Sequence, residues 1–258
     1  MKSYREYALG SVPMHDSDEL RSLLRDVIVR ERIQHVVETG THEGMGSTRF
    51  VAESFPPAAS PASFVTIEAG WKSWRRARRN LRRFSFVTPV WGHTLGLRTA
   101  IEFVERDECI RHHERYPDVF IDEVDDPVAF YTRELERGLD GTPRQIHRRL
   151  QFAIDRRFRY SGEDLLAKSL SCVRDEMPLV ILDSAGGTGW LEFTTLVETM
   201  QTRPYVLLLD DVHHLKHFRS LAHVRQDPAF EILGLDEAHG WMLAKHDGRG
   251  SLRALRAE

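Results

Sequence analysis

The segment His35–Thr48 constrains the fold of this chain more than any other. It contains an apolar run that ends in the acid Glu38, then a turn rich in glycine, then the start of a helical pattern. Glycines let backbone approach a ligand where a side chain would collide, and the helix that follows directs unpaired N–H groups toward it. The segment therefore predicts the first strand, the ligand loop and the first helix of a nucleotide-type α/β domain.

Two common phosphate-binding motifs are absent from this turn. The dinucleotide fingerprint G-x-G-x-x-G needs glycines at its third and sixth positions, but counting from Gly40 these positions hold His42 and Met45. The P-loop pattern G-x-x-x-x-G-K-[ST] does not occur here either. NAD is thus disfavoured as a ligand, and the pattern that remains is E-x-G-x-x-x-G.

This pattern resembles the first motif of the class I S-adenosylmethionine (SAM)-dependent methyltransferases, in which the acid and the glycine turn surround the amino-acid end of the cofactor. A second apolar run, Phe64–Glu68, also ends in an acid. In the family, such an acid accepts hydrogen bonds from the ribose hydroxyls. The resemblance implies a cofactor site made of Glu38, Gly40, Thr41, Gly44, Ser47, Thr48, Glu68, Trp91, Gly92 and His93. The alternative is an ordinary βαβ unit whose acids cap helices, and Ser47 and Thr48 could equally be caps.

Apolar runs typical of strands alternate with helical patterns along the chain. We expect strands at about 35–38, 64–68, 85–90, 178–183, 204–210, 230–234 and 240–245, and a turn at 91–94. Such alternation favours a parallel, doubly wound sheet. The short link near 234–240 predicts an antiparallel last pair, as in the methyltransferase fold. The expected fold class is α/β: a seven-stranded Rossmann-like methyltransferase sheet with its last strand antiparallel.

The stretch between the third and fourth strands is far longer than one crossover helix requires. We expect one domain, 1–258, with sheet blocks at about 33–103 and 178–246 and a helical insertion at 104–177 between them. Helical spacing recurs within the insertion. It would serve as a lid or substrate platform, or equally as an element of homo-oligomerisation.

Acids follow two of the expected strands at their carboxyl ends. Asp183 ends the fourth strand, and Asp210 and Asp211 end the fifth. Ligands of doubly wound sheets bind beyond these ends, so the carboxylates should converge, and a hard divalent cation, Mg²⁺ above all, would neutralise them. The spacing resembles that of cation-dependent O-methyltransferases and of cephalosporin-hydroxylase-like and macrolide-sugar methyltransferases, which implies a metal at these positions. Alternatively, one aspartate caps a helix while another contacts substrate without metal.

The general base is not fixed by this resemblance. Those enzymes commonly place a Lys or His three residues after the first metal ligand, where this chain has Gly186. The histidines His213, His214 and His239 are the candidates, because a side chain with a pKa near neutrality suits proton removal. Each could also be a packed or surface histidine.

Composition and the remaining motifs narrow the partners. The net charge of -3 gives no overall attraction to nucleic acid or membrane, no apolar run approaches the roughly 20 residues of a membrane span, and the two cysteines, Cys109 and Cys172, are far apart. We therefore expect a soluble, cytoplasmic protein. The helix expected at 71–83 is dense in arginine and includes Trp71 and Trp74, which suits either a solvated face or nucleic acid.

These observations favour SAM-dependent methyl transfer to an oxygen of a small-molecule acceptor, assisted by a divalent metal. The alternatives are an RNA or other nucleic-acid methyltransferase that uses the basic helix, a metal-dependent enzyme of another reaction class, and a non-catalytic SAM-binding module. The motifs N-P-P-[YFW] and Pro-Cys, which serve base methylation, are absent.

Overall fold

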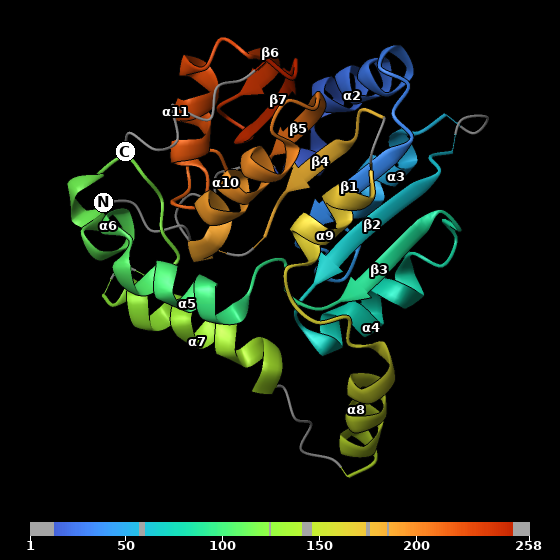
Figure 1. The fold of residues 1–258 in the computed structure, drawn as a ribbon, viewed down its shortest axis with the longest axis vertical. Coiled ribbons are helices and arrows are strands. Elements are labelled where there is room, and N and C mark those ends of the chain that lie inside the picture. The colour runs from blue at the N-terminus through green and yellow to red at the C-terminus, as the bar shows by residue number, and fades with distance from the viewer. Residues whose placement is uncertain are drawn as a thin grey trace.

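One mixed sheet organises the part of the chain that the computed structural model describes, residues 13–56, 60–123, 125–140, 146–173, 176–184 and 186–249. Its strands are β1 (His35–Thr39), β2 (Ser63–Glu68), β3 (Val87–Trp91), β4 (Leu179–Leu182), β5 (Tyr205–Leu209), β6 (Phe230–Asp236) and β7 (Trp241–His246). They lie in the order β3-β2-β1-β4-β5-β7-β6, and β7 is antiparallel to both neighbours (Figure 1). The predicted seven-stranded sheet with an antiparallel last strand is confirmed.

Helices cover both faces of this sheet. The helices of the described residues are η1 (Met14–Asp16), α2 (Asp18–Arg30), α3 (Ser47–Ser54), α4 (Trp71–Asn80), α5 (Leu97–Arg106), α6 (Glu108–Arg111), η2 (His113–Arg115), α7 (Pro127–Asp140), α8 (Ile146–Arg159), α9 (Leu165–Cys172), η3 (Gly186–Thr188), α10 (Gly189–Met200) and α11 (Phe218–Gln226). Helix α2 begins where the sequence supplies a cap, since the Ser17 side chain accepts a hydrogen bond from the Leu20 N–H.

The core forms on both faces because successive strand residues point to opposite sides. Val36 packs in one apolar cluster with residues of α2, α3 and α4, while its neighbour Val37 packs in another with residues of α9, α10 and α11. The central strands β4 and β5 are buried along their whole length, which explains why they read as unbroken apolar runs rather than as alternating patterns.

The third strand differs from its predicted bounds. It covers Val87–Trp91 rather than 85–90, so Trp91 is the last strand residue and not part of a turn. Trp91 pairs in register with Glu68 of β2, and its ring stacks on Trp74 of α4 at a centroid distance of 5.6 Å. This aromatic packing holds the backbone extended for one residue longer than the apolar pattern indicated.

The long segment between β3 and β4 packs at separate places. Helix α9 belongs to the layer on the sheet, where Leu166 and Leu170 join the core. Helix α7 is anchored through Tyr131 in a cluster with α5 and α6, whereas α8 is anchored through Phe152 against the tryptophans of α4 and β3. In the described residues, none of the helices combines the length and apolar character of a membrane span.

Truncation of a buried residue in a central strand should destabilise the fold. Leu208 of β5 is fully buried, so Leu208→Ala should lower the free energy of unfolding by about 2–5 kcal/mol through lost burial and an unfilled cavity. Leu150→Ala is the matched control, because that side chain is 65% exposed and its loss should change stability by no more than about 0.5 kcal/mol. Urea denaturation of both variants measures the difference. Equal losses would contradict this assignment of the core.

Candidate functional site

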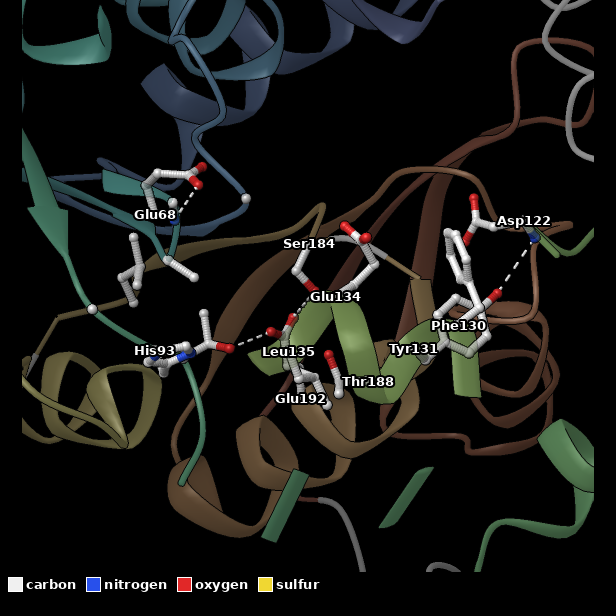
Figure 2. Close-up of a pocket in the computed structure, with 17 residues that line it drawn as sticks. Glu68, His93, Asp122, Phe130, Tyr131, Glu134, Leu135, Ser184, Thr188 and Glu192 are labelled. Atoms are coloured by element: carbon white, nitrogen blue, oxygen red, sulfur yellow. Dashed lines mark hydrogen bonds between the residues drawn. The ribbon is translucent and has the colours of Figure 1, made fainter. Parts of the chain in front are cut away.

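A cavity of about 500 Å³ lies beyond the carboxyl ends of the parallel strands. One wall comes from the strand ends and the loops after them, including Glu68, Gly92 and His93. The opposite wall comes from α7 and the turn before it, including Tyr131 and Asp122 (Figure 2). This is the edge at which open α/β sheets bind ligands, and α7 converts it into a cleft.

Glu68 presents its carboxylate at the wall of the cavity that the strand ends form. Its Oε2 accepts a hydrogen bond from the His42 N–H at 2.7 Å, and its Oε1 accepts one from the Gly70 N–H at 2.7 Å. Burial raises the pKa of Glu68 to about 7, although these two backbone donors oppose the shift. The glycine turn after β1 and the end of β2 are thus joined through one carboxylate that also faces the cavity.

Glu38 lies behind this surface and is fully buried. Its Oε2 accepts hydrogen bonds from the hydroxyls of Thr48 and Thr66, each at 2.6 Å. Its Oε1 is buried and has no hydrogen-bond partner among the described residues. Burial raises the pKa of Glu38 to about 7 despite the two hydroxyl donors. The acid of the first motif therefore braces α3 and β2 against β1.

The two glycines of the turn have different neighbours. Gly40 has a φ of +83° and lines the cavity, and a Cβ there would overlap the Asp183 carbonyl. Gly44 has a φ of +71°, but a Cβ at this position would point at the Leu81 side chain at the end of α4 rather than into the cavity. Close approach of two strand ends, rather than of a ligand alone, requires glycine at position 40.

The other predicted cofactor residues fall into two groups. Gly92 and His93 line the cavity, and the Nε2 of His93 is buried without a hydrogen-bond partner among the described residues. Burial lowers the pKa of His93, so its ring is neutral and can accept or donate one hydrogen bond there. The remaining predicted residues, Thr41, Ser47, Thr48 and Trp91, are buried next to the site and do not line the cavity.

Glu192 is a residue of this site that the sequence analysis missed. It is fully buried on α10 and accepts hydrogen bonds from the hydroxyls of Thr39 at 2.9 Å, Thr94 at 2.5 Å and Ser184 at 2.7 Å. Thr39 ends β1, and Thr94 and Ser184 follow β3 and β4, so one carboxylate fixes three strand ends around the cavity. In the sequence, Glu192 stands four residues before Leu196, so the two side chains share the face of α10 that packs into the core. An acid at such a position is the signal that the sequence offers.

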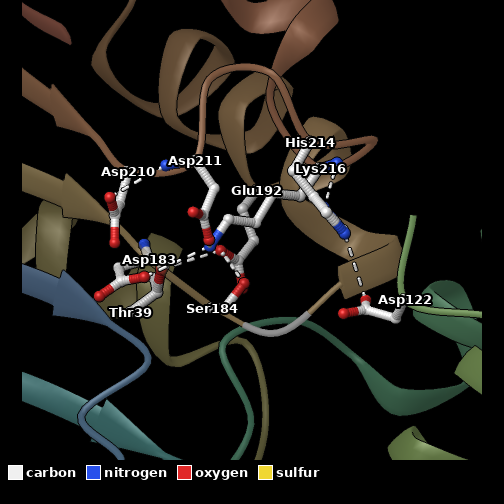
Figure 3. A network of polar contacts seen from close by, with 9 residues as sticks. All are labelled: Thr39, Asp122, Asp183, Ser184, Glu192, Asp210, Asp211, His214 and Lys216. Carbon is white, nitrogen blue, oxygen red and sulfur yellow. Dashed lines mark hydrogen bonds and ion pairs between the residues drawn. The ribbon is translucent and has the colours of Figure 1, made fainter. Parts of the chain in front are cut away.

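The three predicted metal ligands do converge. Carboxylate oxygens of Asp183, Asp210 and Asp211 all lie within 4.8 Å of one another. The sequence analysis missed a buried cation in the same place: the Nζ of Lys216 lies 2.9 Å from an oxygen of Asp211 and 3.3 Å from an oxygen of Asp183 (Figure 3). The acid cluster, meaning these three aspartates, is therefore partly neutralised by the protein itself.

The cluster is electrostatically uneven. Burial and the charges of Asp183 and Asp211 raise the pKa of Asp210 well above its usual range. Burial alone would raise the pKa of Asp211 too, but the ammonium of Lys216 lowers it below the usual value. Asp210 is thus the member whose negative charge is least stabilised by the residues around it.

The three candidate base histidines occupy different surroundings. His214 is buried, and its Nε2 lies 3.4 Å from an oxygen of Asp122, which lines the cavity. His213 is half-buried, and its carbonyl accepts a hydrogen bond from the Phe120 N–H. His239 pairs with Asp236 in the turn between β6 and β7. None of the three is among the residues that line the described cavity.

The tryptophans of the basic helix are not available for stacking on bases. Trp71 and Trp74 are 5% and 3% exposed and pack with Trp91 and Phe152. The hypothesis that α4 binds nucleic acid therefore has no exposed tryptophan of this helix to support it. Its remaining support is the arginines of α4.

Comparisons with known proteins reveal solved structures that share little sequence identity with this chain. No family model matches it, and no curated protein matches it. Solved structures with a similar arrangement include an O-methyltransferase from Bacillus cereus in complex with SAH, with 14% identity over 94% of this chain and 88% of that chain and a TM-score of 0.46. They also include a putative caffeoyl-CoA O-methyltransferase from Staphylococcus aureus, with 13% identity over 94% and 88% of the two chains and a TM-score of 0.44. The fold assignment rests on the strand order of this chain, and its function must be argued from its own site.

The buried carboxyl of Glu38 should make stability depend on pH. Because the pKa of Glu38 is about 7 in the folded protein and 4.5 for a glutamate in water, the folded state holds the proton more tightly than the unfolded chain. The stabilisation by this proton is present below pH 4.5 and is lost as the pH rises through 7. In the wild type, the free energy of unfolding should therefore fall by on the order of 2–3 kcal/mol between about pH 5 and pH 8. Glu38→Gln should abolish this fall.

Denaturation curves at several pH values measure this slope. Glu53→Gln is the control, because its arginine partners lower the pKa of Glu53 and its slope has the opposite sign. An unchanged slope in the Glu38 variant would show that this carboxyl does not titrate in the folded protein as described.

Proposed function

We propose that this protein transfers the methyl group of SAM to an oxygen of a small-molecule acceptor. The observation that carries the proposal is the position of Glu68, whose carboxylate lines the cavity at the end of β2 beside the Gly40 turn. An acid at this place can accept hydrogen bonds from the two hydroxyls of a ribose. The strand order of the sheet agrees with this use of the site.

The residues at the cofactor side fit SAM. Glu68 would hold the ribose, the turn at Gly40 would lie against the amino-acid end, and Gly92 with His93 would lie near the adenine. The unpartnered Nε2 of His93 supports this fit, because a buried polar atom in a cavity wall needs a partner and a ligand can supply one. When bound, SAM supplies a methyl group on a cationic sulfonium, which carboxylates in the lining of the cavity would favour electrostatically.

The acceptor would lie between the cofactor side and α7. Phe130, Tyr131 and Leu135 give that wall an apolar and aromatic character, and Asp122 supplies a polar group at its end. We propose that Asp122, positioned by His214, accepts the proton of the acceptor hydroxyl. The other task of the protein is alignment, because methyl transfer requires the acceptor oxygen to lie in line with the sulfonium.

A divalent cation at the acid cluster is the second part of the proposal. Carboxylate oxygens are the donors that Mg²⁺ prefers, and the three side chains are close enough to share one ion. The charges also agree, since three carboxylates and the ammonium of Lys216 leave two formal negative charges, which one divalent ion would balance. Such an ion would orient an acceptor oxygen and lower its pKa.

Removal of the Glu68 carboxylate should weaken cofactor binding. Glu68→Ala should raise the Kd for SAM by about tenfold or more, because a hydrogen bond to a charged group contributes about 1.5–3 kcal/mol. Isothermal titration of the wild type and the variant measures this, and Glu237→Ala, an exposed acid paired with Arg225, is the matched control. Absence of SAM binding by the wild-type protein would overturn the methyltransferase proposal.

The acid cluster should bind metal independently of SAM. Asp210→Ala/Asp211→Ala should abolish the heat of Mg²⁺ binding while SAM binding survives, and Lys216→Met should raise the affinity for Mg²⁺ because it removes a competing cation. Asp236→Ala, outside the cluster, is the control. Metal-free wild-type protein with undiminished methyl transfer would refute the metal part and leave the cofactor part standing.

A further inference from the structure

The outermost face of α8 carries a stripe of exposed apolar side chains. Ile146, Leu150, Ile154 and Phe158 are 84%, 65%, 45% and 78% exposed, and they follow one another at intervals of four residues. Residues four apart differ by only about 40° around an α-helix, so the four form one continuous ridge. We call this ridge the α8 stripe.

The opposite side of α8 holds the helix on the protein. Phe152 packs edge-on against Trp71 at a centroid distance of 5.4 Å, and the buried carboxylate of Asp155 accepts a hydrogen bond from the Trp71 Nε1 at 3.0 Å. The α8 stripe therefore points away from the anchored side. Figure 1 places α8 at one end of the long axis of the molecule.

The exposed charges that α8 and α4 carry are of one sign. Asp155 is the one acid in the sequence of α8 and is buried, whereas Arg156 and Arg157 are exposed. The neighbouring helix α4 has no acid in its sequence and adds exposed cations that include Lys72 and Arg79. This end of the molecule thus combines a projecting apolar ridge with a concentration of positive charge.

From this combination we propose that α8 docks the protein on a membrane surface rich in anionic lipid. A helix with large apolar residues on one face and arginines beside them lies in the headgroup region, where the apolar face is buried and the cations meet anionic headgroups. This contact differs from a membrane span, so the lack of a spanning helix among the described residues does not bear on it. The proposal is independent of the methyl-transfer proposal.

Two other occupants fit the observations less well. Pairing of α8 with α8 of a second copy would bring arginines of both helices together with no exposed acid between them. Nucleic acid would use the cations but would leave the apolar ridge in water, and the tryptophans on the anchored side of α8 are buried and cannot stack on bases.

The test is flotation of the full chain with lipid vesicles. We expect binding to vesicles of phosphatidylcholine mixed with phosphatidylglycerol, little binding to phosphatidylcholine alone, and weakening by salt. Leu150→Gln/Phe158→Gln should lower the partition constant by about tenfold or more, because the apolar contribution is lost. Arg156→Gln/Arg157→Gln should reduce the preference for the anionic vesicles.

Val29→Gln/Met45→Gln is the matched control, since these apolar side chains are 61% and 50% exposed on other parts of the surface and their change should leave binding intact. Circular dichroism shows that each variant is folded. Failure of the wild type to bind anionic vesicles at low salt would overturn the proposal, as would equal losses in the control. A dimer in sedimentation that the Leu150/Phe158 variant abolishes, without vesicle binding, would assign the stripe to a second copy instead.

Discussion

The buried carboxylate of Glu192 is the interaction on which the geometry of the cavity depends. Hydroxyls at the carboxyl end of β1 and after β3 and β4 all donate to it, so three separate strand ends keep fixed positions relative to α10. An unpaired buried carboxylate would be strongly destabilising, and three donors are what make it tolerable here. The strand ends can therefore present Glu68, Gly92 and His93 to a ligand from a rigid frame.

The acid cluster adds a different constraint at the same edge of the sheet. Its carboxylates are held close together by strand spacing, and Lys216 reaches them from the loop after β5. The protein thus supplies a cation of its own at the place where the sequence suggested an external one. A lysine and a divalent ion can share such a cluster, because each satisfies different oxygens of the carboxylates.

The sheet could be predicted from the sequence because the patterns that indicate strands are local. Apolar runs that end in Glu38, Glu68 and Asp183 mark strand ends, and the alternation of strands with helices predicts that the strands run parallel. Trp91 was assigned to a turn because its place depends on Trp74 and Phe152, which lie far away in the chain. Glu192 and Lys216 were missed for the same reason. Their roles depend on distant partners that no spacing rule connects.

The segment between β3 and β4 is anchored in two separate clusters, and each cluster supports a different wall of the cavity. Helix α7 is fixed through Tyr131 to α5 and α6, while the chain leaving α8 is fixed beside the wall made by the strand ends, where the His93 N–H donates to the Gly162 carbonyl. Substitutions on the inner face of α7 can therefore accumulate without disturbing Glu68 or His93. An ancestral protein with this arrangement could change the α7 wall over evolution while the wall that carries Glu68 and His93 stayed constant.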